Sequence, residues 1–139
     1  MTRYGPILLR IILGIIFVMN GYFALFVLRP GGAANLFTVI GVPLGSALAW
    51  YLIVAHVAGG LMMIVGLKTR WAAIANLPII LIALVLLHVH QGFFMTGTIV
   101  DAAAGTARAV GLEYPLLVLG ATAALALLGG GAWAMTDDG

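Results

Sequence analysis

Residues 44–67 read LGSALAWYLIVAHVAGGLMMIVGL, an apolar run without a charged side chain. A helix of about twenty apolar residues crosses the hydrocarbon core of a bilayer, and it satisfies its backbone hydrogen bonds internally. The run therefore predicts a membrane-spanning helix. Near its middle stands His56, a titratable side chain of a kind that is costly at membrane depth and usually faces the interior of a bundle.

Three similar runs accompany this one, separated by short polar or glycine-rich breaks. The predicted spans cover about residues 5–28, 44–67, 71–95 and 113–133. Nothing resembling a linker divides the 139 residues, so we expect a single domain. The predicted fold class is all-α: an integral membrane four-helix bundle.

The two longer connections between the predicted spans contain apolar segments that are too short to cross a bilayer. Residues 33–42 are predicted to form a surface or re-entrant helix, and residues 102–110 a short interfacial helix. Both connections lie on the outer side of the predicted bundle.

The amino-acid composition indicates that the chain is embedded in a lipid bilayer. Hydrophobic residues make up 64% of the sequence and charged residues 7%, whereas about a quarter of the residues of a soluble domain are charged. The apolar surplus must therefore contact the lipid bilayer. The basic residues are scattered rather than clustered on one face, which argues against nucleic acid as a partner. The absence of cysteine excludes disulfides, thiolate metal sites and iron–sulfur ligation.

The basic residues predict the orientation. With four spans, one side of the membrane carries both chain ends and the basic residues Arg3, Arg10, Lys68 and Arg70, and the other carries Arg29 and Arg108. By the positive-inside rule, both termini are predicted to be cytoplasmic in a multi-pass protein of the cytoplasmic (inner) membrane. Arg10 lies within the first span, so we expect its side chain to snorkel toward the interface.

Four polar side chains are expected at similar depth in the bundle. Asn20 lies past the midpoint of the first span, His56 near the middle of the second, and His88 in the outer half of the third. Glu113 stands at the outer start of the fourth. Convergence of such groups predicts a polar ligand-binding pocket in the outer half of the bundle.

Each of these residues also has a structural interpretation. His56 shares a helical face with Gly59, Gly60 and Met63, and this face favours close packing against a neighbouring helix. The imidazole ring is then either a buried group that hydrogen-bonds between helices or a group that binds a ligand or handles protons. Glu113 opens a helix, where the dipole favours a carboxylate and free N–H groups need a cap.

A metal centre is a weaker alternative. His88 and His90 lie about 200° apart on a helix, so they face one centre only if the helix ends near them. His90 is expected to be an interfacial ring. The candidate ligands of a metal site are His56, His88 and His90, but these residues have no ligand spacing such as His-x-x-x-His. A haem held between His56 and His88 is likewise not supported by any spacing motif.

Four pieces of the sequence resemble, in order and spacing, the DoxX family of small four-helix membrane proteins. They are Leu9-Arg10 with Gly14 and Asn20-Gly21, then Gly59-Gly60 with GLKTRWAA at residues 66–73, then His88 with QGFF at residues 91–94, and then GLEY at residues 111–114. The likeness covers most of the chain. It differs at two positions: His56 stands where the family often has a glutamate, and Ala24 where it often has a lysine.

The resemblance implies a four-helix bundle and a link to membrane redox biology. Some relatives look like membrane subunits that pass electrons from sulfur compounds to quinone, and others accompany soluble oxidoreductases. A role that depends on the missing glutamate or lysine is not carried over to this chain.

Two functions follow as hypotheses. The first is a membrane subunit or accessory protein of a redox system, with a quinone or similar lipophilic ligand held by Asn20, His56, His88 and Glu113. If the chain takes part in catalysis, it does so within an oxidoreductase complex whose partner supplies electrons for the quinone. The alternative is a non-catalytic anchoring or assembly protein, as a homo-oligomer or in a larger membrane complex, whose small residues mediate helix association. A carrier is a third, weaker hypothesis, because the predicted spans contain few charges and no pair of broken helices.

Overall fold

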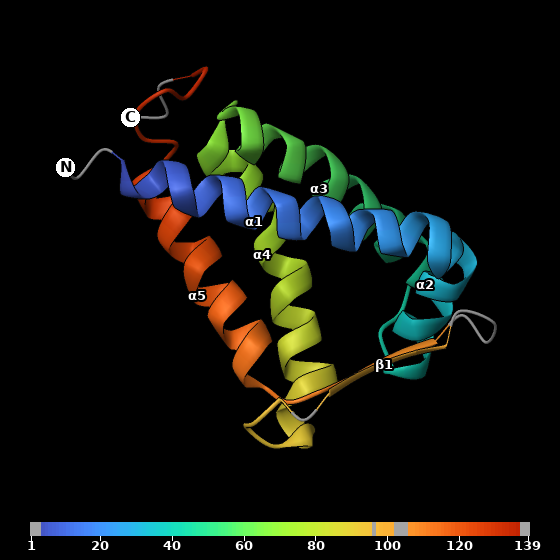
Figure 1. The fold of residues 1–139 in the computed structure, drawn as a ribbon. Helices are drawn as coiled ribbons and strands as arrows, with labels where there is room; N and C mark the ends of the chain where they lie inside the picture. Colours follow the sequence, from blue (N-terminus) through green and yellow to red (C-terminus); the bar gives the residue numbers. More distant parts are fainter. Residues whose placement is uncertain (1–3, 96, 102–105, 137–139) are drawn as a thin grey trace.

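The computed structural model describes residues 4–95, 97–101 and 106–136. Their α-helices are α1 (Gly5–Tyr22), α2 (Arg29–Val39), α3 (Gly45–Val65), α4 (Thr69–Ile82) and α5 (Glu113–Leu128). A π-helical segment, η1 (Phe23–Val27), extends α1. The π-helical η2 (Ala83–His88) and the 3-10 turn η3 (Val89–Gln91) extend α4. Strands β1 (Gly97–Asp101) and β2 (Thr106–Val110) form an antiparallel hairpin (Figure 1).

The predicted helical membrane bundle is confirmed in its main features. Three helices are long and apolar enough to cross a membrane, Gly5–Val27, Gly45–Val65 and Thr69–Gln91, and a shorter apolar helix, Glu113–Leu128, accompanies them. The fourth helix was expected to continue to about residue 133. It ends at Leu128 because Gly129 adopts a positive φ of 75°, a conformation that glycine tolerates and that stops the helix.

Glycine lets α1 and α3 pack with their backbones in contact. A Cβ atom on Gly14 would lie 2.7 Å from the carbonyl oxygen of Gly60, and one on Gly60 would lie 2.8 Å from the carbonyl oxygen of Gly14. Small residues permit such close approach of helices in membranes. Figure 1 shows α4 and α5 running side by side away from the α1–α3 pair, so the bundle is splayed toward the end that carries α2 and the hairpin.

Each long helix has a buried stripe and an exposed apolar stripe. On α1, Leu13 and Phe17 are buried in a core that also contains Met63 and Leu125. The opposite face of α1 exposes large apolar side chains: Leu8, Ile12, Ile15 and Met19. Apolar side chains on the outside of membrane-spanning helices contact the lipid bilayer.

Arg10 does not snorkel, and that prediction is wrong. Its side chain is 3% exposed, and its guanidinium donates to the carbonyl oxygens of Met63 (3.2 Å), Ile64 (3.0 Å) and Trp133 (3.0 Å). The carbonyls of the last turn of a helix have no partner within the helix and carry partial negative charge. Arg10 therefore caps the end of α3 from within the bundle and holds the segment after α5.

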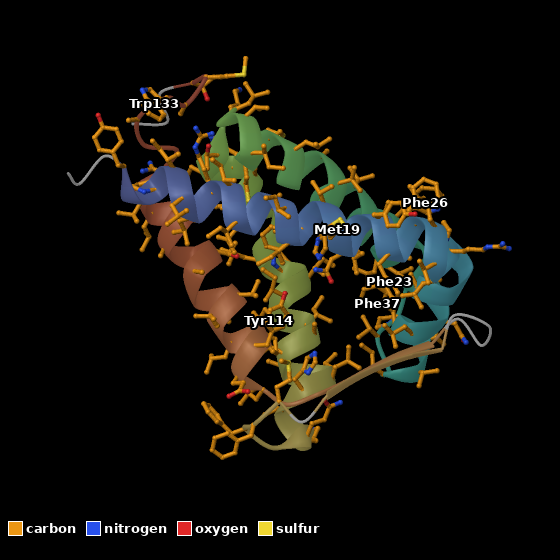
Figure 2. The ribbon with its side chains drawn as sticks, viewed as in Figure 1. Met19, Phe23, Phe26, Phe37, Tyr114 and Trp133 are labelled. Carbon is orange, nitrogen blue, oxygen red and sulfur yellow. The ribbon has the colours of Figure 1, made fainter. Side chains whose placement is uncertain are left out.

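The described ends of the chain meet at the same end of the bundle. The ring of Trp133 packs edge-on against that of Tyr4, with centroids 5.8 Å apart, and Figure 2 shows Trp133 beside the start of α1. The backbone N–H of Thr136 donates to the carbonyl of Gly66 (3.2 Å), and its hydroxyl accepts from the backbone N–H of Lys68 (2.6 Å). Neighbouring ends are what an even number of membrane crossings requires.

The connections differ from expectation in detail. The helix expected over residues 33–42 is present as α2, but it begins earlier, at Arg29. The helix expected over residues 102–110 is wrong for Thr106–Val110, which is a strand, while residues 102–105 lie outside the described part. This strand pairs with Gly97–Asp101 in an antiparallel register.

Candidate ligand-binding site

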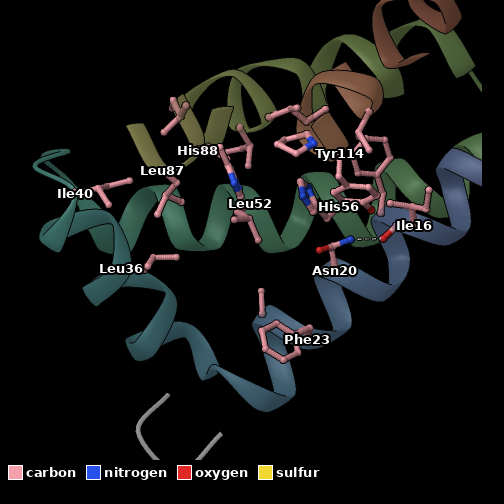
Figure 3. Close-up of a pocket in the computed structure, with 18 of the residues that line it drawn as sticks. Ile16, Asn20, Phe23, Leu36, Ile40, Leu52, His56, Leu87, His88 and Tyr114 are labelled. Carbon is pink, nitrogen blue, oxygen red and sulfur yellow. Dashed lines mark hydrogen bonds between the residues drawn. The ribbon is translucent and has the colours of Figure 1, made fainter. Parts of the chain in front are cut away.

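The splayed end of the bundle contains a partly open cavity of about 640 Å³, within the range of about 300–1,000 Å³ typical of small-molecule sites. Figure 3 shows side chains from α1, α2, α3 and the start of α5 around it. Its walls are mostly apolar. Its polar side chains are Asn20, His56, His88, Gln91 and Tyr114.

The structure brings three of the four predicted site residues to this cavity, namely Asn20, His56 and His88. Glu113 is not part of the lining. Its Oε1 accepts a hydrogen bond from the backbone N–H of Met95 (2.9 Å), and its own N–H donates to the carbonyl of Phe93 (3.0 Å). Glu113 thus ties the start of α5 to the segment that follows η3.

His56 is 8% exposed and projects from α3. Its ring lies edge-on to that of Phe17 on α1, with centroids 5.1 Å apart. As the spacing predicts, it shares a buried face with Gly59, Gly60 and Met63. His56 Nδ1 is buried, and the ring interacts with the side chain of Asn76 on α4. His56 therefore places a polar ring in a mostly apolar cavity wall.

Asn76 on α4 explains how the helices around His56 are held. Its Nδ2 donates to the carbonyl of Ala55 on α3 (3.0 Å) and to that of Ala72 in its own helix (2.9 Å). Gly59 makes room for this amide, because a Cβ there would lie 2.6 Å from Nδ2. The Asn76 side chain also interacts with that of His56. The amide therefore fixes α4 against α3 next to the histidine.

His88 lies where the third long helix ends. The backbone changes from α-helix to π-helix at Ala83 and to a 3-10 turn at Val89, and Gly92 (φ 81°) follows. The side chains of His88 and Gln91 interact with each other, and both line the cavity. His90 is exposed and does not line the cavity. Of the two histidines near the helix end, His88 alone lines the cavity.

Both π-helical segments contribute to the cavity wall. Phe23 and Ala24 come from η1, and Ala83, Leu87 and His88 from η2. Single π-helical turns inside α-helices often occur at functional sites, where they displace side chains from their regular helical positions. Neither segment has a sequence signal that distinguishes it from ordinary α-helix, so the sequence did not predict them.

Sequence reasoning also missed Gln91 and Tyr114. Both belong to the short motifs that carry the family resemblance, QGFF and GLEY, and this was the only signal that pointed to them. Tyr114 lies one residue after Glu113, and its side chain interacts with that of Asn20 on α1. Tyr114 therefore lines the part of the cavity wall where Glu113 was expected.

The metal alternative has no support in the geometry. In residues 4–95, 97–101 and 106–136, no group of three or more His, Asp or Glu side chains is arranged to hold a metal ion. His56, His88 and His90 therefore do not form a shared metal site.

Fold and cavity together define a multi-pass membrane protein built as a helical bundle with a pocket between its helices. The chain belongs to the DoxX family: the sequence model of that family, described as DoxX, matches residues 5–89. This range includes the lining residues Asn20, His56 and His88 and ends before Gln91 and Tyr114. No curated protein and no solved structure matches the chain.

Proposed function

We propose that this protein is a membrane-embedded subunit or accessory protein of a redox system, and that its cavity binds a quinone or a similar lipophilic ligand. The observation that supports this proposal is the convergence of Asn20, His56 and His88, from three different helices, on one apolar cavity. Membership of the DoxX family supports the redox association.

The side chains around the cavity suit a quinone head group. A quinone has a flat apolar ring with carbonyl oxygens that accept hydrogen bonds. Imidazole N–H, amide N–H and phenol O–H groups donate such bonds, and His56, His88, Gln91 and Tyr114 offer them. The Asn20 Nδ2 already donates to the carbonyl of Ile16 (2.8 Å), which holds this amide at the cavity wall.

In the proposed mechanism the residues of this chain bind and orient the head group and move protons. A bound quinone supplies the electron-accepting chemistry. The electrons come from a partner, because the chain has no cysteine with which to hold an iron–sulfur cluster. His88 is suited to deliver a proton, since imidazole changes its protonation readily and the ring lies at the end of its helix.

A matched pair of histidine variants tests the proposal. His88→Phe removes the polar ring from the cavity wall, whereas His90→Phe makes the same change at an exposed position outside it. Binding of decylubiquinone to the purified protein in detergent is measured by equilibrium titration. We expect His88→Phe to weaken quinone binding by about tenfold or more, because it removes one buried hydrogen bond between neutral groups. His90→Phe should leave quinone binding unchanged.

Equal binding by wild type and His88→Phe would overturn the assignment of the site. Circular dichroism of both variants checks that the helical bundle is retained. If the wild type binds no quinone, the alternative function stands instead, an anchoring or assembly protein in which the buried histidines serve only packing.

A further inference from the structure

We infer that the cavity has two chemically different ends, one for the head group of its ligand and one, formed with α2, for an apolar tail. This inference rests on the proposed function and deepens it. It assigns a ligand class, tailed lipid-borne quinones, and it makes residues of α2 determinants of which tail is accepted.

The cavity differs in polarity from one end to the other. In Figure 3, Asn20, His56 and Tyr114 lie toward one end, Leu36 and Ile40 lie toward the other, and His88 and Leu87 lie between them. The lining residues of α2 and of the position directly after it are Leu36, Phe37 and Ile40, and all three are apolar. No polar side chain from α2 lines the cavity.

The size of the cavity requires more than a ring. An engineered cavity of about 150 Å³ holds a benzene molecule, whereas this cavity measures about 640 Å³. A quinone ring placed among the polar side chains therefore leaves the apolar end unfilled. A hydrocarbon chain attached to the ring fills that space without bringing a polar group into it.

The apolar end is a preformed wall rather than a loose loop. Phe37 is 4% exposed and Ile79 is 4% exposed, and together with Ala33 and Ala49 they form a compact cluster between α2, α3 and α4. Ile40, Leu52 and Ile82 pack against this cluster and also line the cavity. Close-packed side chains resist a change of even one methylene in volume, so this wall discriminates tails by shape.

Shape, rather than hydrophobicity, is the expected source of selectivity. Lipid tails are as apolar as leucine side chains, so a quinone tail gains little hydrophobic free energy on moving from the bilayer into an apolar pocket. A larger side chain at the apolar end will therefore reduce tail binding by clash, with little effect on the ring. Leu36 is the position to enlarge, because it lines the cavity and is not part of the cluster around Phe37.

The test combines one tryptophan variant, a matched control and two ligands. Leu36→Trp fills the apolar end, and Val39→Trp introduces the same side chain on the same helix at a position that is 76% exposed and outside the cavity. The ligands are decylubiquinone and the same quinone ring without its tail. We expect Leu36→Trp to weaken decylubiquinone binding by about tenfold and to leave binding of the tail-less ring unchanged. Val39→Trp should alter neither.

The outcomes separate the tail site from the head site. If Leu36→Trp changes the binding of neither ligand, or weakens the binding of both equally, the proposed tail site is wrong. The proposed head-group site still stands in that case if His88→Phe weakens the binding of both ligands. If the wild type binds neither ligand, the proposed function itself fails. If Leu36→Trp does not fold, the comparison is repeated with Leu36→Phe, which adds a smaller side chain. Leu36→Phe must likewise weaken binding of the tailed quinone and leave binding of the tail-less ring unchanged.

Discussion

At the residue scale, two buried polar side chains in apolar helices have different surroundings. Arg10 has its terminal nitrogens satisfied by three backbone carbonyls of the chain itself. His56 instead lines the cavity, where its ring interacts with the side chain of Asn76. Arg10 thus anchors the end of α3, whereas the place of His56 in the cavity wall supports the proposed role in binding.

Arg10 is predicted to be a major contributor to stability. Arg10→Met removes the donor from the end of α3 and leaves buried carbonyls unpaired, so we expect the free energy of unfolding to fall by about 1–3 kcal/mol. Arg29→Met, at an exposed position, is the control and should have little effect. Thermal unfolding in detergent, followed by circular dichroism, measures both. Equal midpoints for the two variants would contradict the capping role.

The sequence predicted which polar residues to examine but not all of their contacts. Asn20, His56 and His88 are conspicuous because each interrupts an apolar run. The role of Arg10 was missed because its partners, Met63, Ile64 and Trp133, are distant in sequence. Contacts of this kind depend on how the helices pack, which a run of apolar residues does not specify.

At the scale of elements, the apolar runs predicted the long helices well, since lipid imposes helical structure on any spanning segment. The hairpin was missed because a short segment of mixed polarity has no strong periodicity. The π-helical segments η1 and η2 were missed because their sequences are ordinary apolar helix. These two segments shape the cavity, so its detailed form was beyond prediction.

Two glycines on the helices are predicted to respond oppositely to the same substitution. Gly60→Ala places a methyl group 2.8 Å from the Gly14 carbonyl oxygen, so α1 and α3 must separate, and we expect a loss of about 1–3 kcal/mol. Gly120 on α5 has no atom within 4 Å of such a methyl group. Gly120→Ala should raise stability by about 0.4–1 kcal/mol, because alanine favours the helix.

Thermal unfolding of the two alanine variants under identical detergent conditions tests this contrast. A Gly60→Ala protein as stable as the wild type would show that the α1–α3 contact is not close in solution. A destabilised Gly120→Ala protein would instead indicate that this exposed face of α5 is packed against another chain.

At the scale of the whole molecule, the ends of the chain meet through Tyr4, Trp133 and Thr136. This arrangement accords with an even number of crossings, and the distribution of basic residues predicts that both termini are cytoplasmic. A green fluorescent protein fused to the C terminus should therefore fluoresce in cells, and alkaline phosphatase fused at the same place should be inactive. An active phosphatase fusion would reverse the predicted orientation.

The central claim is that the splayed bundle holds a lipophilic redox ligand among Asn20, His56 and His88. Native mass spectrometry of the protein, purified gently from its own membranes, tests it most directly. We expect an added mass that solvent extraction identifies as a quinone, and this mass should be absent from His88→Phe and retained in His90→Phe. A protein that carries no small molecule and travels only with a stoichiometric partner, or with copies of itself, would contradict the account and identify an anchor.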